Sequence, residues 1–213
     1  MKLKKTTLTI LAIILICAIS ITGTLAYLQA NTSEVKNTFV AAGGGSLFED
    51  EDGDGEADGA LTLNESKAVR DANTGAYTLG TEKVTSNNYT VVPGATIPKD
   101  PKVTVTGKND VPAYLYVEIV NNTGDIISFT VADGWTKVEG AGAPNGGTVY
   151  VWNNTLTDDL AATSILKGDT VTVKKGDTLS FETGKDTVSF YAYLAQSVVG
   201  DKTTAKDVFN ECF

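Results

Sequence analysis

The feature that most constrains the fold is the alternation of apolar and polar residues in short segments after residue 59. These segments are rich in Val, Thr, Tyr and Phe, and turn signals such as "NNTGD" and "APNGG" separate them. The segments lie at 60–63, 76–79, 88–92, 102–107, 113–122, 127–132, 148–152, 169–175, 177–183 and 187–197. Strands at this spacing are typical of sandwiches and jelly rolls. We therefore predict an all-β, antiparallel jelly-roll or β-sandwich domain over residues 61–213.

Helical patterns are confined to two short stretches. Residues 155–163, "TLTDDLAAT", predict one or two helical turns. Residues 203–213 predict a short helix that begins at an N-cap, Thr203 or Thr204. The residues expected on one face of this helix are Ala205, Val208 and Phe209. We interpret both stretches as peripheral to the β domain.

The N-terminus has the three parts of an export signal. A lysine-rich start precedes an apolar stretch over residues 8–22, and small residues follow at Thr24 and Ala26. We predict cleavage between Ala26 and Tyr27, which makes residues 1–26 a signal peptide. The alternative is an uncleaved anchor, because the apolar stretch approaches the ~20 residues that a bilayer-spanning helix needs.

Two further segments precede the predicted domain. Residues 27–46 contain a short strand-like end, "NTFVAA", followed by the flexible hinge "GGGS". Residues 47–60 form an acidic, glycine-rich loop. Cleavage would therefore leave a free N-terminal strand on a flexible hinge.

Composition excludes several classes of function. The chain has no histidine, so Ser-His-Asp and Cys-His catalysis and His-based zinc chemistry are excluded. The net charge is −9, which disfavours nucleic acid as a partner because phosphate contacts need clustered Lys and Arg. The sequence shows no other catalytic constellation, and a carboxylate-only hydrolase, in which two acids suffice for glycoside hydrolysis, is the remaining alternative. We predict that the protein is not an enzyme and that it has no catalytic residue.

Cysteine usage excludes an internal disulfide after cleavage. Cys17 lies within the predicted signal, and Cys212 is the penultimate residue. The Cys212 thiol has two interpretations, a frayed terminal group or a site of intermolecular pairing.

The acidic loop has the spacing of a calcium-binding loop. Its acids alternate around Gly55, as in the D-x-D-x-D-G pattern whose oxygens wrap one ion. The candidate ligands are Asp50, Asp52, Asp54, Glu56 and Asp58. Position 12 of the loop is Leu61, where an EF-hand places a bidentate Glu. A weak extracellular calcium site and a solvated acidic loop therefore both remain open, and no cofactor is required.

Three stretches together resemble the TasA/camelysin family of exported proteins, which carry the SipW-cognate class of signal peptide. They are "GTLAYL" followed by "NTF", "NYTVVPGATIPKDPKVTVTG" over 88–107, and "VSFYAYLAQSVV" over 188–199. The resemblance implies a jelly-roll domain, processing by a signal peptidase of the SipW type, and assembly into extracellular fibres of a biofilm matrix. The sequence departs from the pattern where "GGGSLFEDEDGDGEADG" intervenes before the first sheet strand, and where "VPAYLY" replaces a Cys-Tyr pair.

The function expected from these observations is that of a secreted structural protein of the extracellular matrix or cell surface. Its freed N-terminal strand would add to the sheet of a neighbouring copy, which makes an open filament. The residues expected in this polymerisation strand are Val35, Asn37, Thr38, Phe39 and Val40. The alternative for residues 27–46 is pairing within their own domain, or disorder. Membrane contact is expected only through the uncleaved precursor.

A second function class uses the same fold. A monomeric surface adhesin or carbohydrate-binding module would need Trp135 and Trp152 to line an exposed groove. The other interpretation of both tryptophans is core packing.

The proline-rich segment "PGATIPKDP" predicts a stiff crossover between two sheets. Pro93, Pro98 and Pro101 fix φ and donate no ladder hydrogen bond. Lys99 and Asp100 lie between the last two prolines and are expected to form a solvent-exposed pair of small energetic value. A substrate site is the alternative, but the sequence shows no third group beside them.

Overall fold

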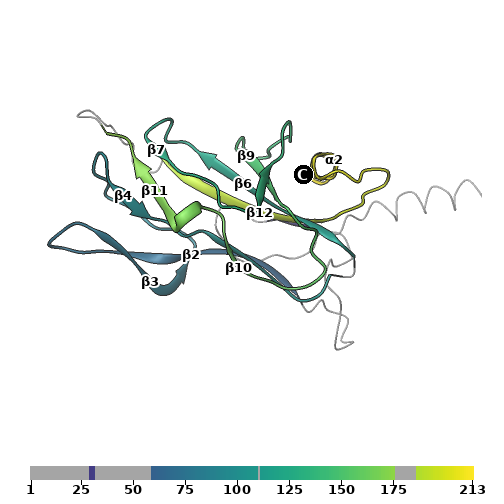
Figure 1. The fold of residues 1–213 in the computed structure, drawn as a ribbon, viewed down its shortest axis with the longest axis horizontal. Coiled ribbons are helices and arrows are strands. Elements are labelled where there is room, and N and C mark those ends of the chain that lie inside the picture. Colours follow the sequence, from purple (N-terminus) through teal and green to yellow (C-terminus); the bar gives the residue numbers. More distant parts are fainter. Residues whose placement is uncertain (1–28, 32–58, 110, 176–185) are drawn as a thin grey trace, which may run out of the picture.

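The computed structural model describes residues 29–31, 59–109, 111–175 and 186–213. Its elements, in chain order, are β1 (Gln29–Asn31), β2 (Ala60–Arg70), β3 (Tyr77–Val84), β4 (Thr96–Pro98), β5 (Lys102–Thr106), β6 (Ala113–Asn121), β7 (Ile127–Ser128), β8 (Trp135–Lys137), β9 (Thr148–Trp152), β10 (Leu160–Ser164), η1 (Lys167–Asp169), β11 (Thr170–Val173), β12 (Val188–Gln196) and α2 (Ala205–Cys212). Figure 1 shows their arrangement. The predicted all-β antiparallel sandwich is confirmed.

The strands form three antiparallel sheets. The largest has the order β1-β12-β6-β9-β8, the second β10-β5-β2-β3, and the third β4-β11-β7. In the largest sheet, β12 pairs with β6 over its whole length, from Val188↔Asn121 to Gln196↔Ala113. The β6–β12 pair is therefore the centre of the fold, and the other elements pack around it.

The main hydrophobic core lies between the sheets. Inward-facing residues of β2 and β5, such as Leu63 and Val103, meet Leu115 of β6 and Leu194 of β12. All four are at most 1 % exposed. The third sheet contributes Ile97, Ile127, Val171 and Val173 to the same core. The apolar half of each alternating strand thus accounts for this layer.

A second core lies on the opposite face of the largest sheet. Tyr116 of β6 and Tyr193 of β12 pack there against Val208 and Phe209 of α2. Phe209 is fully buried, with ring centroids 5.0 Å from Tyr116 and 5.6 Å from Tyr193. Figure 1 shows α2 beside β6 and β12, away from β2 and β10. The predicted helix is therefore more than peripheral, because it makes β6 and β12 buried on both faces.

The local signals of α2 are those expected from its sequence. Thr204 is the N-cap, with extended backbone, and its hydroxyl accepts a hydrogen bond from the Asp207 amide. Asp207 also places a negative charge in the first turn, where the helix dipole favours it. The second of the two predicted caps is thus confirmed.

Three predictions about elements were wrong. Residues 155–163 contain no helix, because Leu160–Ser164 forms strand β10 and pairs with β5. Residues 88–92 form no strand, and the Thr90 amide donates to the Tyr77 hydroxyl instead of a sheet ladder. The strand predicted at 127–132 is reduced to Ile127–Ser128.

Several predictions fall outside the described residues. These are the signal segment 1–26, the whole of the predicted strand 177–183, the acidic loop up to Asp58, and the proposed polymerisation strand. Within the part that is described, no helix is long and apolar enough to cross a bilayer.

Candidate functional site

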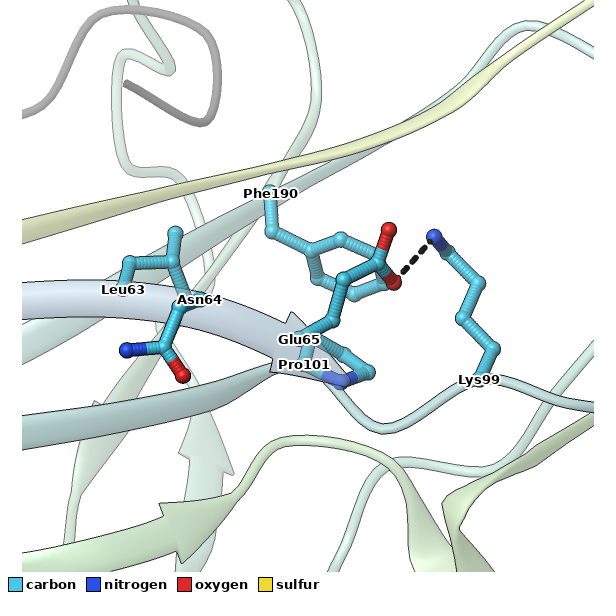
Figure 2. Close-up of a pocket in the computed structure, with 6 residues that line it drawn as sticks. All are labelled: Leu63, Asn64, Glu65, Lys99, Pro101 and Phe190. Atoms are coloured by element: carbon cyan, nitrogen blue, oxygen red, sulfur yellow. Dashed lines mark hydrogen bonds and ion pairs between the residues drawn. The ribbon is translucent and has the colours of Figure 1, made fainter. Parts of the chain in front are cut away.

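A cluster of buried charged residues lies where β2 meets the segment between β4 and β5. Lys99 Nζ donates to Glu65 Oε2 over 2.8 Å, and the two side chains are only 12 % and 5 % exposed. Figure 2 shows the Lys99 ammonium reaching the Glu65 carboxylate beside the Phe190 ring. This ion pair is buried among apolar groups, where desolvation of both charges is costly.

The neighbouring residue, Asp100, has its own set of partners. It is 3 % exposed, and its carboxylate accepts the Ser66 amide over 2.7 Å and the Ser66 hydroxyl over 2.8 Å. Lys83 Nζ donates to the same Ser66 hydroxyl over 3.0 Å. Ser66 therefore links a lysine on β3 to the carboxylate of Asp100.

The expectation of an exposed Lys99–Asp100 pair was wrong. Asp100 is buried and Lys99 is largely buried, and each binds a residue of β2 that is 34 positions away in the sequence. Third groups do accompany them, namely Glu65 and Ser66. The prolines on either side hold the segment extended, so successive side chains point in different directions and reach different partners.

Asp169 of η1 closes the far side of the cluster. Lys102 Nζ lies 3.6 Å from Asp169 Oδ2 and 3.9 Å from Asp100 Oδ2. Asp169 has φ 51°, the one positive φ of a non-glycine residue in the described ranges. Its backbone carbonyl accepts the Lys99 amide over 2.8 Å. The left-handed backbone at Asp169 is a local strain that the surrounding contacts hold in place.

Tyr89 borders the cluster from the loop before β4. Its hydroxyl donates to the Pro98 carbonyl over 3.0 Å. Burial raises the pKa of Tyr89 well above its ordinary value, and the negative charges of Glu65 and Asp100 raise it further. Tyr89 is therefore a neutral hydrogen-bond donor at all physiological pH values.

The hollow beside this cluster is too small for a metabolite. Its lining residues are Leu63, Asn64, Glu65, Lys99, Pro101 and Phe190, and it offers about 10 Å³ of room. Ligand pockets usually measure about 300–1,000 Å³, whereas one water needs about 10–15 Å³. The cluster is therefore a structural junction with space for about one water molecule.

A second buried carboxylate lies on the other face of the central sheet. Glu118 of β6 is 0 % exposed and accepts the amides of Asn145 and Gly147 over 3.0 and 2.8 Å. Its other oxygen accepts the Asn145 side-chain amide over 3.0 Å and the Tyr193 hydroxyl over 2.8 Å. Four donors thus surround one carboxylate and fix the turn at residues 143–147 to the sheet.

The two tryptophans pack against each other. Trp135 is 8 % exposed, and its indole nitrogen donates to the Ser164 carbonyl over 3.0 Å. Trp152 is half-buried, and the two ring centroids are 5.2 Å apart in an edge-to-face arrangement. Core packing is therefore the role of Trp135, and its ring is not available for stacking on a sugar.

Cys212 is the last residue of α2 and is half-buried rather than frayed. It packs against the aromatic residues of the second core. Burial raises the pKa of the Cys212 thiol to about 11, with a smaller contribution from Glu211. The thiol is thus largely protonated at neutral pH, which lowers its reactivity.

The sites expected in the N-terminal region are not among the described residues. Cleavage between Ala26 and Tyr27, the strand around Phe39, and the acidic calcium loop stay predictions. In the described ranges, no group of three or more His, Cys, Asp and Glu residues could hold a metal ion.

A sequence signal for the buried cluster does exist. Leu61, Leu63 and Glu65 alternate along β2, so Glu65 falls in the row that faces the core. A buried carboxylate needs a partner, and Lys99 is that partner. The same alternation places Glu118 in one row with Tyr114 and Tyr116. The sequence does not show that this row is buried, because its burial depends on α2 packing over it.

The described residues define a class of fold, an all-β sandwich of three antiparallel sheets with one C-terminal helix on its outer face. Comparison of the chain with protein-family models, curated proteins and solved structures gave no match. Any functional conclusion therefore depends on the residues themselves.

Proposed function

We propose that the protein is a secreted structural protein of the extracellular matrix or cell surface, TasA-like, that assembles into biofilm fibres. Its freed N-terminal strand adds to the sheet of a neighbouring copy. Secretion rests on the signal pattern of residues 1–26, and fibre formation rests on the sequence resemblance described above.

The observation from which this mechanism is built is the pairing of β1 with β12, which in this structure lies within one chain, as the alternative for residues 27–46 expects. Gln29, Ala30 and Asn31 pair antiparallel with Ala195, Leu194 and Tyr193, at the edge of the largest sheet. These residues begin just two positions after the predicted start of the mature chain. The edge of β12 can therefore receive a strand from the N-terminal region.

Strand exchange would use the same pairing between two copies. If β1 leaves its own domain, the equivalent strand of a neighbour can take its place on β12. Backbone hydrogen bonds supply affinity, and alternating side chains set the register. Such a head-to-tail contact does not close on itself, so repeated exchange makes a filament.

The alternative function, a monomeric adhesin or carbohydrate-binding module, gains no specific support. Its proposed binding aromatic Trp135 is buried and has its indole hydrogen bond satisfied within the fold. We therefore carry only the fibre proposal forward.

Disulfide trapping tests which copy provides the strand. Gln29 and Ala195 are register partners, and Cα atoms of paired antiparallel residues lie at about 4.5–5.5 Å, within the range of a disulfide. The variant Gln29→Cys/Ala195→Cys would be made in the mature chain with Cys212→Ser, so that no other thiol is present. The chain would be oxidised under conditions in which fibres form, and then separated without reductant.

Strand exchange predicts a ladder of covalent oligomers, which collapses to monomer when reductant is added. The matched control, with Gln29→Cys alone, should give no ladder beyond a dimer. If fibres form but the double variant yields only internally bonded monomer, β1 stays in its own chain and strand donation by this segment is wrong.

A further inference from the structure

The contact between Lys99 and Glu65 joins two segments that are far apart in the sequence. Glu65 belongs to β2, and Lys99 belongs to the linker between β4 and β5. The two residues close a loop that includes β3 and β4. A covalent bond at this point would tie the loop to the sandwich.

The groups that surround the Lys99 ammonium include two aromatic rings. Lys99 Nζ lies 5.4 Å from the centroid of the Phe190 ring and 5.9 Å from that of Tyr89. Leu63, Pro101 and one polar residue, Asn64, complete the lining of the adjacent hollow (Figure 2). Such surroundings make both charges of the ion pair costly to bury, so a reaction that removes both charges would relieve that cost.

The forms that react in a condensation are the neutral amine and the neutral carboxylic acid. Reacting groups that a fold holds in contact reach effective molarities of about 10⁵–10⁸ M. The amine nitrogen starts 2.8 Å from the Glu65 oxygen, with its approach fixed by the backbone on both sides. The adjacent hollow has room for about one water molecule, which is the leaving group of an amide-forming step.

We propose that Lys99 and Glu65 condense into an intramolecular isopeptide bond. The Lys99 nitrogen attacks the Glu65 carboxyl carbon, and a C–N bond forms. The C–O bond to one carboxyl oxygen breaks, and that oxygen leaves as water with one hydrogen from the acid and one from the amine. No oxidant, metal or other reactant is needed, and both buried charges disappear.

Mass spectrometry of the denatured mature chain tests this proposal directly. The bond predicts an intact mass lower than the sequence mass by one water molecule. It also blocks trypsin at Lys99, so digestion should leave a branched peptide in which residues 37–67 are joined to residues 84–102. A full sequence mass, or linear peptides cleaved after Lys99, would overturn the proposal.

Two variants locate the loss of mass. Glu65→Gln can form the same amide with release of ammonia, so its mass should equal that of the wild-type chain. Lys99→Arg keeps the positive charge beside Glu65 but forms no such amide, so its full sequence mass is expected. If Lys99→Arg still lacks one water, the loss occurs elsewhere, for example at an Asp-Gly pair, and the proposal is wrong.

Discussion

Tyr193 of β12 donates its hydroxyl hydrogen to Glu118 of β6 over 2.8 Å, although the two residues are 75 positions apart in the sequence. The contact joins the two central strands to the turn that carries Asn145, because Asn145 also donates to both groups. One buried carboxylate therefore organises the face of the sheet that α2 covers.

Glu118→Gln should destabilise the fold. All four groups around the Glu118 carboxylate are hydrogen-bond donors. The NH2 group of a glutamine side chain cannot accept from them, so at least one buried donor loses its acceptor. We expect the free energy of unfolding to fall by about 1–3 kcal/mol. Urea denaturation measures this change. Glu139→Gln is the matched control, because the Glu139 side chain is 78 % exposed in its pair with Lys137. Equal stability of the two variants would contradict the role given to Glu118.

Phe209→Ala tests whether α2 is an integral part of the fold. Phe209 is fully buried between Tyr116 and Tyr193, so its removal leaves a cavity in the second core. We expect a loss of about 3–5 kcal/mol in the free energy of unfolding. The exposed neighbour Lys206 provides a control, since Lys206→Ala should change stability by less than about 0.5 kcal/mol. A similarly small effect of Phe209→Ala would mean that the helix is not packed on the sheet.

Alanine substitutions at Gly134 and Gly124 distinguish backbone strain from a steric clash. Both have positive φ, 95° and 59°, so alanine is strained at either position. A Cβ at Gly134 would also collide with the Trp152 ring, whereas at Gly124 it would meet no atom within 4 Å. We expect Gly124→Ala to cost about 1 kcal/mol and Gly134→Ala at least twice as much. Thermal unfolding of the two variants measures the difference. Equal losses of stability would show that the Trp152 ring can move aside at little energetic cost.

The thiol of Cys212 should react slowly in the folded protein. Burial raises its pKa from 9.0 to about 11, so the thiolate population near pH 8 is reduced by about a hundredfold. Alkylation by iodoacetamide should therefore be much slower in buffer than in urea. An equal rate in both would show that the C-terminal turn is open.

The same pKa shift links Cys212 to stability at high pH. Because the folded pKa is raised, folding favours the protonated thiol. Its contribution is fully present below about pH 9 and is lost as the pH rises toward 11. Cys212→Ser should remove this part of the alkaline destabilisation, which urea titrations at pH 8 and 10.5 would detect.

Alternation in the sequence predicted several strands, including β6, although α2 buries β6 on both faces. Residues 148–152 coincide with β9, and residues 102–107 and 113–122 contain β5 and β6. The prediction failed at Leu160–Ser164 because pairing with β5 overrides a weak local helical tendency. It also failed at Tyr89, whose side chain rather than backbone joins the fold.

The buried cluster was harder to predict from the sequence than the strands. Lys99 and Asp100 are neighbours in the chain, which suggested a pair, but their partners Glu65 and Ser66 are fixed by tertiary structure. The inward position of Glu65 could be read from its strand. The identity of its cation could not, because it depends on where the proline-rich crossover passes β2.

Electron microscopy of the mature chain, residues 27–213, beside the same chain without residues 27–42 is the most direct test of the proposed function. The deletion removes both β1 and the predicted polymerisation strand, and it leaves the described sandwich from Ala60 onward. We expect fibres from residues 27–213 and only monomers from the shortened chain. Fibres from both chains would contradict assembly through the N-terminal strand, and fibres from neither would contradict self-assembly of this protein.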